Sequence, residues 1–309
     1  MIPSASPLVS VIIPTFNHAH FLRAALDSVC KQTAPSWEAI VVNNFSTDET
    51  IALVQSYSEP RIRLINFENH GVIGAARNQG IAASKGRYIA FLDSDDVWFP
   101  EKLARSVTIL EQGFDLVCHG EYWLGRGNPR KVCYGPASHA RFDALLFQGN
   151  CLSTSAVVVR KSVLDRCGGF SEKPEFITAE DYHLWMKLAR DGARMFFLPE
   201  ALGEYRIHSG NQSKAVLRNM QAELAVVEEF LSSLKSASVL TRIRARRRRA
   251  LAYYGAGRGL HATAKPAEAL LWFAKAFLTF PLIPRLYVAA ALSSFWFIKQ
   301  AGRKTATAV

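Results

Sequence analysis

Three carboxylates lie within four residues of this sequence, at Asp93-Ser94-Asp95-Asp96. They follow the apolar run Tyr88–Leu92, which has the composition of a buried strand. Carboxylates this close together repel one another unless a cation or hydrogen-bond donors neutralise them. Carboxylate oxygens are suitable ligands for a Mg²⁺ or Mn²⁺ ion that also binds a diphosphate. The alternative is a solvated acidic turn ahead of a helix near Pro100, but the position after an apolar strand favours a metal site.

A second acidic pair, Glu180-Asp181, precedes apolar residues at helical spacing, Leu184, Trp185 and Leu188. A carboxylate at the start of a helix is often only a cap, since the helix dipole favours negative charge there. A carboxylate can also remove the proton from a hydroxyl that attacks an electrophilic carbon. Both interpretations remain open from these residues alone.

The elements that must position these acids alternate between strand and helix. Apolar runs at Val9–Pro14, Ala39–Val42 and Tyr88–Leu92 predict buried strands, and helical patterns lie between them. This alternation predicts an α/β fold with a mostly parallel, doubly wound sheet. Ligands of such sheets bind outside the carboxyl ends of the strands, where Thr15–Asn17, Asn43–Asp48 and Asp93–Asp96 fall. Ser46 and Glu49 have the spacing of a capping box that opens a helix.

Five segments, in this order, resemble glycosyltransferase family 2: VSVIIPTFN at Val9–Asn17, NHGVIGAARNQGIAASKGRYIAFLDSDD at Asn69–Asp96, GGF at Gly168–Phe170, EDYHLW at Glu180–Trp185 and YRIHSGNQS at Tyr205–Ser213. The resemblance covers about residues 8–213. It implies the GT-A fold, with a mixed doubly wound sheet, and an inverting, hexosyltransferase-type enzyme. Its donor would be a nucleoside-diphosphate sugar, and its cofactor Mn²⁺ or Mg²⁺.

The same resemblance implies roles for individual residues. Pro14, Thr15 and Asn17 would lie beside the base and ribose, with Arg77 on the nucleotide side of the cleft. Asp93 would contact the ribose or the metal, and Asp95 would be the principal metal ligand. His208 would be a second metal or diphosphate contact. Asp181, with Glu180 beside it, would be the general base opposite the leaving diphosphate. The pair Gly168-Gly169 would let the preceding loop close over the acceptor.

One segment departs from the family pattern. The family usually has VDDGSTD after its second strand, with an aspartate that accepts the uracil imide proton, whereas this chain has Val42-Asn43-Asn44-Phe45-Ser46-Thr47-Asp48. Asn44 stands at the base-reading position. Because an amide can both donate and accept a hydrogen bond, the sequence leaves the nucleotide base open.

The charge of the chain is unevenly distributed. Of 309 residues, those from Arg206 onward include 17 basic and 4 acidic side chains, while the part before them is close to neutral. We therefore expect a catalytic domain at 1–213 and a basic helical extension at 214–309. The five cysteines form no CxxC pair, which fits a reducing compartment. The N-terminus MIPSASPLVS has no signal-peptide pattern, which predicts a cytoplasmic protein.

The basic extension has six arginines within a short stretch, Arg242, Arg244 and Arg246–Arg249. A nucleic acid, an anionic lipid surface or plain solvent could face them. The segment Leu282–Ile298 is apolar but holds Arg285, and it falls short of the ~20 apolar residues of a spanning helix. With aromatic residues such as Trp272 and Trp296 nearby, we expect a peripheral helix at the inner face of the cell membrane and rank nucleic acid second.

Together these features predict an enzyme that builds a surface polysaccharide or lipid-linked glycan. Two alternatives remain from the sequence. Asn43-Asn44 could mark a nucleotide-sugar binder without turnover, or the arginines could mark a nucleic-acid-binding protein.

Overall fold

The computed structural model describes residues 6–125, 127–208, 210, 215–234 and 238–306, with side chains as far as residue 298. The chain divides into two compact units, Met1–Leu145 with Asn150–Asn211, and Leu146–Gly149 with Gln212–Val309. Each unit has its own hydrophobic core. The expected boundary between residues 213 and 214, and the end of the YRIHSGNQS segment, lie outside the described residues.

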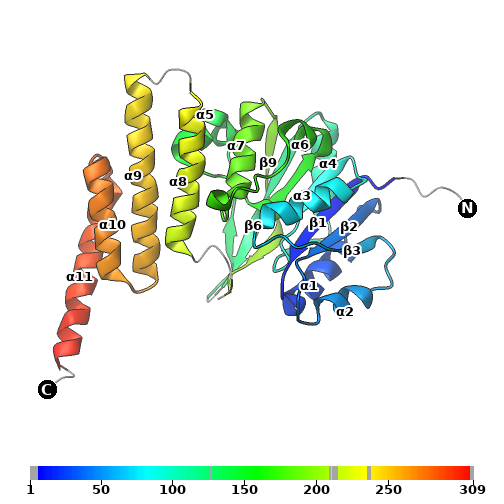
Figure 1. Ribbon diagram of the computed structural model, residues 1–309, viewed down its shortest axis with the longest axis horizontal. Helices are drawn as coiled ribbons and strands as arrows, with labels where there is room; N and C mark the ends of the chain where they lie inside the picture. Colours follow the sequence, from blue (N-terminus) through cyan, green and yellow to red (C-terminus); the bar gives the residue numbers. More distant parts are fainter. Residues whose placement is uncertain (1–5, 126, 209, 211–214, 235–237, 307–309) are drawn as a thin grey trace, which may run out of the picture. The chain divides into compact units, whose positions relative to one another are not determined.

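The first unit is built on one mixed sheet (Figure 1), in which the described residues form nine strands. Four parallel strands come first in the chain: β1 (Val9–Thr15), β2 (Trp37–Asn43), β3 (Ile62–Asn66) and β4 (Tyr88–Phe91). The sheet order is β3-β2-β1-β4-β8-β6-β9-β5, and β7 pairs with β6. Strand β8 is antiparallel to both β4 and β6, whereas β6 and β9 are parallel. The remaining strands are β5 (Val97–Trp98), β6 (Leu116–Leu124), β7 (Arg130–Val132), β8 (Val157–Arg160) and β9 (Met195–Arg206).

Helices cover both faces of the parallel strands. Alternate residues of β1, among them Val11 and Ile13, pack in one core with α1 and α4. On the other face α3 comes so close that a Cβ at Gly80 would lie 2.4 Å from Ile12. The α-helices of this unit are α1 (Ala19–Cys30), α2 (Thr50–Gln55), α3 (Ile73–Ala83), α4 (Lys102–Glu111), α6 (Lys161–Cys167) and α7 (Glu180–Arg190). Helix α5 (Phe142–Gln148) crosses the division between the units, and single 3₁₀ turns are η1 (Ala137–Ala140), η2 (Thr154–Ala156) and η3 (Pro174–Phe176).

The predicted capping box of α2 is wrong. The helix begins at Thr50, and its side-chain cap is not Ser46. Instead the Ser46 hydroxyl donates to Asn43 Oδ1 at 2.6 Å and accepts from the Asn17 backbone amide at 2.8 Å. Asp48 Oδ1 accepts from the Thr50 amide at 3.0 Å. Ser46 therefore joins the loops after β1 and β2 instead of opening a helix.

The second unit is helical, as expected for the C-terminal region. Its helices are α8 (Val216–Ser232), α9 (Val239–Ala262), α10 (Pro266–Thr279) and α11 (Pro284–Ala306). Each packs against the next in the chain (Figure 1). A core around Leu260, Phe273 and Leu286 joins the last three, and Gly257 leaves room for the Phe273 ring, which a Cβ there would approach to 2.5 Å. No helix among the described residues has the length and apolar character needed to cross a membrane.

Candidate active site

The polar segments singled out in the sequence meet at the carboxyl ends of β1, β2 and β4. In the parallel pairing of β1 and β2, Thr15 lies beside Asn43, and the Asn44 amide donates to the Thr15 carbonyl at 3.0 Å. Asn17 Oδ1 then accepts from the Thr47 amide at 2.8 Å. Pro14 is buried within β1 beneath these loops. The two loops are therefore tied to each other at the edge where ligands of such sheets bind.

The two asparagines that replace the usual aspartates have different environments. Asn43 is fully buried, and its amide nitrogen donates to Asn66 Oδ1 at 2.8 Å. Asn44 is half-buried, and its Oδ1 accepts from the Asn69 backbone amide at 2.9 Å. Because a backbone N–H can only donate, this contact sets the orientation of the Asn44 side chain. Asn43 is structural, whereas Asn44 presents an oriented amide near the strand ends.

Two phenylalanines flank these loops and had no role in the sequence interpretation. Phe16 and Phe45 are exposed, although most large apolar side chains of this unit are buried. Phe45 has φ 52°, in the left-handed region that a bulky residue rarely adopts. Backbone of this kind persists where the surroundings fix it, often at ligand sites. An exposed aromatic ring can stack on a planar ligand, and Phe16 and Phe45 directly follow Thr15 and Asn44 in the chain.

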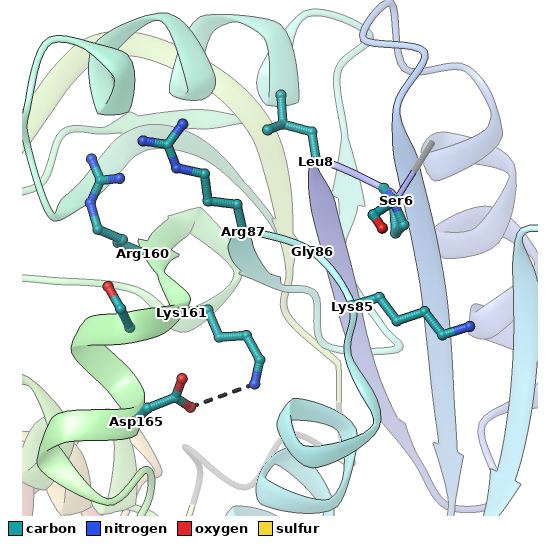
Figure 2. A pocket seen from close by; sticks show the side chains of 10 residues that line it. Ser6, Leu8, Lys85, Gly86, Arg87, Arg160, Lys161 and Asp165 are labelled. Carbon is teal, nitrogen blue, oxygen red and sulfur yellow. Dashed lines mark ion pairs between the residues drawn. The ribbon is translucent and has the colours of Figure 1, made fainter. Parts of the chain in front are cut away.

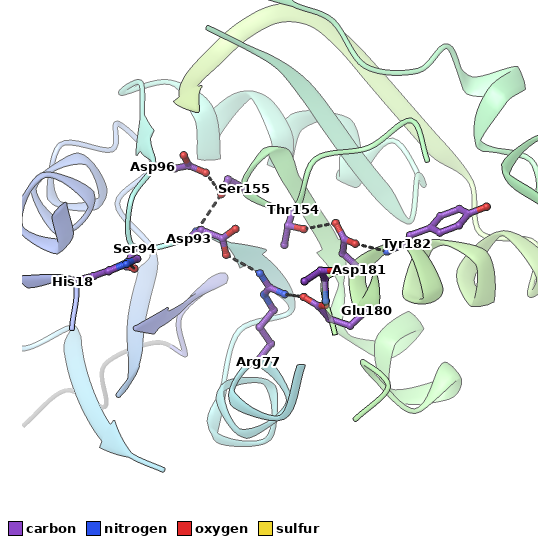
Figure 3. Close-up of polar contacts among 11 residues, drawn as sticks. His18, Arg77, Asp93, Ser94, Asp96, Thr154, Ser155, Glu180, Asp181 and Tyr182 are labelled. Carbon is purple, nitrogen blue, oxygen red and sulfur yellow. Dashed lines mark hydrogen bonds and ion pairs between the residues drawn. The ribbon is translucent and has the colours of Figure 1, made fainter. Parts of the chain in front are cut away.

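The four residues Asp93–Asp96 point to four different partners. Asp93 pairs with Arg77 at 2.7 Å, and Ser94 lies 2.9 Å from His18 Nδ1 (Figure 3). Asp95 Oδ2 lies 2.8 Å from His208 Nε2. Asp96 is buried and accepts from the Ser155 hydroxyl at 2.6 Å, and burial together with the carboxylates around it raises the pKa of Asp96 well above its usual value. Asp96 therefore supports the loop, and Asp93 and Asp95 are the more exposed acids of this segment.

Asp95 and His208 fit one side of a divalent-ion site. A carboxylate oxygen and an imidazole nitrogen are both ligands of Mn²⁺, and the two side chains converge while keeping some exposure. Among the described residues, no three His, Cys, Asp or Glu side chains gather around one point. A two-ligand arrangement suits an ion whose other ligands are diphosphate oxygens and water.

Arg77 joins the two acidic segments. Its guanidinium pairs with Asp93 Oδ1 and with Glu180 Oε1, each at 2.7 Å, and the side chain is only 3% exposed (Figure 3). Burial acts to lower the pKa of Arg77, but Asp93 and Glu180 outweigh it and raise that pKa. The sequence interpretation put Arg77 on the nucleotide side of the cleft, and the structure gives it a partner on the α7 side as well.

Asp181 is held at the first turn of α7. The Thr154 hydroxyl donates to its Oδ2 at 3.0 Å, and the Tyr182 amide donates to its Oδ1 at 2.6 Å (Figure 3). Burial and the neighbouring Glu180 raise the pKa of Asp181 to about 6, while Arg77 opposes the shift. A carboxylate with this pKa is ionised at neutral pH and is a stronger base than an ordinary aspartate. Thr154 and Ser155, from η2, have no signal in the sequence, because each acts through an acid far away in the chain.

The loop with Gly168-Gly169 is fixed to α3. Both glycines have positive φ, and a Cβ on Gly169 would lie 2.6 Å from Asn78 Oδ1. The Asn78 side chain accepts from the Phe170 amide at 2.8 Å and donates to its carbonyl at 3.0 Å. Lys187 Nζ of α7 also donates to the Gly169 carbonyl at 2.6 Å, so side chains of α3 and α7 both hold this loop in the structure.

A hollow of about 600 Å³ lies next to the start of β1 and the end of β8 (Figure 2). Three of its four cations are in ion pairs: Lys161 with Asp165 at 3.5 Å, Arg87 with Glu111 at 3.0 Å and Arg160 with Asp115 at 3.7 Å. None of the predicted site residues lines it.

Comparison with known proteins identifies the family of this chain. Residues 10–166 match the profile of Glycosyl transferase family 2. An uncharacterised glycosyltransferase of Rickettsia prowazekii is 31% identical over 74% of this chain and 73% of its own length. A UDP-Glc:alpha-D-GlcNAc-diphosphoundecaprenol beta-1,3-glucosyltransferase of Escherichia coli is 28% identical over 73% of this chain and 87% of its own. A putative teichuronic acid biosynthesis glycosyltransferase of Bacillus subtilis is 30% identical over 65% of this chain and 79% of its own.

Solved structures share the fold at low identity. S. aureus TarS in complex with UDP-GlcNAc aligns with TM-score 0.64 and 20% identity, over 96% of this chain and 92% of that one. A mannosyltransferase from Pyrobaculum calidifontis in complex with GDP-Man and Mn²⁺ aligns with TM-score 0.60 and 20% identity, over 96% and 86%. The predicted GT-A fold followed by a helical region is confirmed, and the two non-enzymatic alternatives find no support. The chain belongs to glycosyl transferase family 2 and is a glycosyltransferase.

Proposed function

We propose that this enzyme moves a sugar, with inversion, from a nucleoside-diphosphate sugar to a hydroxyl group of a glycan or lipid-linked acceptor. The observation that carries the proposal is the cluster around Arg77, which joins Asp93 beside β4 to Glu180 and Asp181 at the start of α7. Inverting transfer needs one group on the donor side and a base on the acceptor side, and this cluster contains both.

The residues would act as follows. Asp181 accepts the proton of the attacking hydroxyl, and the Thr154 and Tyr182 hydrogen bonds orient its carboxylate. Glu180 keeps Arg77 in place between the two halves of the site. Asp95 and His208 would hold Mn²⁺ or Mg²⁺, which offsets the charge that builds on the leaving diphosphate. Thr15, Asn17, Asn44 and Asp93 would surround the nucleoside, with Pro14 supporting them from within β1.

The acceptor is proposed from the relatives. The E. coli relative acts on a diphosphoundecaprenol-linked sugar, and the B. subtilis relative is named for teichuronic acid biosynthesis. We therefore place this enzyme in the synthesis of a cell-envelope polysaccharide, at the inner face of the membrane, with residues 1–213 as the catalytic domain and 214–309 as an extension. The nucleotide complexes of TarS and of the Pyrobaculum enzyme support a nucleotide-sugar donor.

The test separates donor binding from transfer. Binding of UDP, GDP, CDP and their sugars is measured by calorimetry with and without Mn²⁺, since metal-dependent binding is expected of the parent. Asp95→Ala should abolish the Mn²⁺-dependent part, whereas Asp181→Asn should retain it and lose transfer by a factor of about 10²–10⁴. Unchanged affinity of the metal–nucleotide complex in Asp95→Ala, or transfer by Asp181→Asn within a few-fold of the parent, would contradict these assignments.

A further inference from the structure

The second unit exposes apolar side chains along two neighbouring helices, α10 and α11. On α10, Leu271 and Leu278 are 72% and 78% exposed and lie two turns apart. On α11, Val288, Leu292 and Phe295 are 63%, 57% and 65% exposed, at a spacing that puts them on one face. Since both helices also bury an apolar face in the core of the unit, they are apolar toward the core and toward the outside.

Charge is nearly absent from this surface. Residues 286–298 have no charged side chain, and the ionic residues of the whole stretch 266–298 are Glu268, Lys275 and Arg285. Single exposed apolar residues are ordinary, but a row of them on adjacent turns marks a binding surface. A helix that is apolar all round normally has protein or lipid on every side.

The net charge of the surrounding residues distinguishes between two possible partners of this surface, a second copy of the unit and a lipid bilayer. From residue 238 to residue 309 there are thirteen basic side chains and one acidic side chain, Glu268. A second copy of this unit would double the net positive charge of the residues around the contact, which disfavours that pairing although the rows themselves are uncharged. A bilayer with acidic lipids instead offers an anionic surface above an apolar interior, and it complements both the charge and the apolar rows.

The arginine run is only partly available to such a partner. Arg248 is almost fully buried and pairs with Glu223, Arg249 pairs with Glu228, and the Arg244 guanidinium lies 4.0 Å from the centre of the Phe147 ring. These three side chains hold the helical unit together. Arg242, Arg246 and Arg247 are exposed. The four arginines Arg246–Arg249 therefore do not face a partner as one group, because Arg248 and Arg249 are engaged within the fold.

We propose that α10 and α11 lie along a bilayer that contains acidic lipids, with their exposed rows in contact with the acyl chains: Leu271, Leu278, Val288, Leu292 and Phe295. Trp296 and Tyr287, both partly exposed, have the apolar body and polar tip typical of the interface. The exposed arginines add long-range attraction. This proposal rests on the proposed function, which places the acceptor at a membrane. It adds the surface of the protein that contacts that membrane.

The experiment measures co-sedimentation of the full chain with vesicles of phosphatidylglycerol and phosphatidylcholine. Each apolar side chain that leaves water strengthens partitioning about tenfold or more. We expect Val288→Ser, Leu292→Ser and Phe295→Ser together to weaken partitioning about a thousandfold. The matched control, Val288→Ile with Leu292→Met and Phe295→Leu, keeps the row apolar and should bind like the parent. Arg242→Gln with Arg246→Gln and Arg247→Gln should weaken binding mainly at low salt.

Fluorescence quenching by brominated lipid tests the contact without any change to the apolar row. Brominated vesicles should lower the tryptophan fluorescence of the parent, and the decrease should be smaller in Trp296→Phe. A parent chain that binds Mn²⁺ and a nucleoside diphosphate but ignores these vesicles would overturn the membrane surface and leave the proposed function standing. A parent that self-associates through the row, so that the serine variant becomes monomeric without any change in vesicle binding, would also overturn it. Vesicle binding without nucleotide binding would support the surface and contradict the proposed function.

Discussion

Arg77 and Glu180 are 103 positions apart in the chain, yet their side chains form a nearly solvent-free ion pair of 2.7 Å. Arg77 is also bonded to Asp93, so one guanidinium pairs with two carboxylates that come from different parts of the sequence. Arginine suits this position because its planar group offers separate N–H donors to two acids at once. The pair therefore fixes the distance between the end of β4 and the start of α7.

The first prediction concerns this bridge. Arg77→Met would leave Asp93 and Glu180 close together without a cation, so the free energy of unfolding should fall by about 3–5 kcal/mol. Urea denaturation followed by circular dichroism measures the change. Arg87→Met is the matched control, because its pair with Glu111 is exposed to solvent and should contribute far less to the free energy of unfolding. An equal decrease in the free energy of unfolding in the two variants would show that the buried ion pairs of Arg77 stabilise the fold no more than an exposed pair does.

The second prediction is a pH profile. Asp181 must be ionised to accept a proton, and burial with Glu180 raises its pKa to about 6. The transfer rate should therefore rise with pH through about 6 and level off above 7. Thr154→Val removes a hydroxyl that stabilises the carboxylate, so the rising limb should move to higher pH by about one unit.

Thr154→Ser keeps the hydroxyl and is expected to reproduce the parent profile. The measurement is the initial rate at saturating donor between pH 4.5 and 8.5. If the transfer rates of the valine and serine variants rise over the same pH range, the Thr154 hydroxyl does not affect the pKa of Asp181.

The third prediction concerns the nucleobase. The Asn69 amide fixes Asn44 Oδ1, so Asn44 offers an amide nitrogen as donor. Asn44→Asp keeps the bond to Asn69 and replaces that donor with an acceptor. The affinity ratio of UDP to CDP should rise about tenfold, because uracil has an imide N–H where cytosine has an acceptor nitrogen. Competition calorimetry with both diphosphates checks this, and an unchanged ratio would mean that Asn44 does not face the base.

Sequence patterns predicted the parts of this molecule that depend on local order. The runs Val9–Pro14 and Tyr88–Leu92 are almost wholly apolar, as is typical of strands buried in a parallel sheet, and the structure has strands there at Val9–Thr15 and Tyr88–Phe91. The capping box at Ser46 failed because its hydroxyl bonds to Asn43 and Asn17 across two loops. Thr154 and the second partner of Arg77 were out of reach for the same reason. Such contacts depend on how distant segments meet, and a single sequence does not encode that in any spacing.

The last prediction concerns a buried acid beneath the site. Glu121 is 1% exposed and accepts a hydrogen bond from the Tyr134 hydroxyl at 2.6 Å. Burial raises its pKa to about 7; the Tyr134 hydrogen bond and the Lys102 ammonium act against this, and Asp93 adds to it. Because the folded-state pKa of Glu121 lies above its unfolded value, protonated Glu121 stabilises the fold fully below pH 4.5, and this contribution is lost as pH rises through about 7. The loss is on the order of 3 kcal/mol.

Glu121→Gln can still accept a hydrogen bond from Tyr134 but carries no charge, so its unfolding free energy should change less between pH 4.5 and 7.5 than that of the parent. Glu175→Gln, at an exposed position, is the control and should keep the slope of the parent. Urea denaturation at a series of pH values measures both slopes. If Glu121→Gln and the parent lose the same stability over this range, another group titrates there and Glu121 stays charged in the folded state.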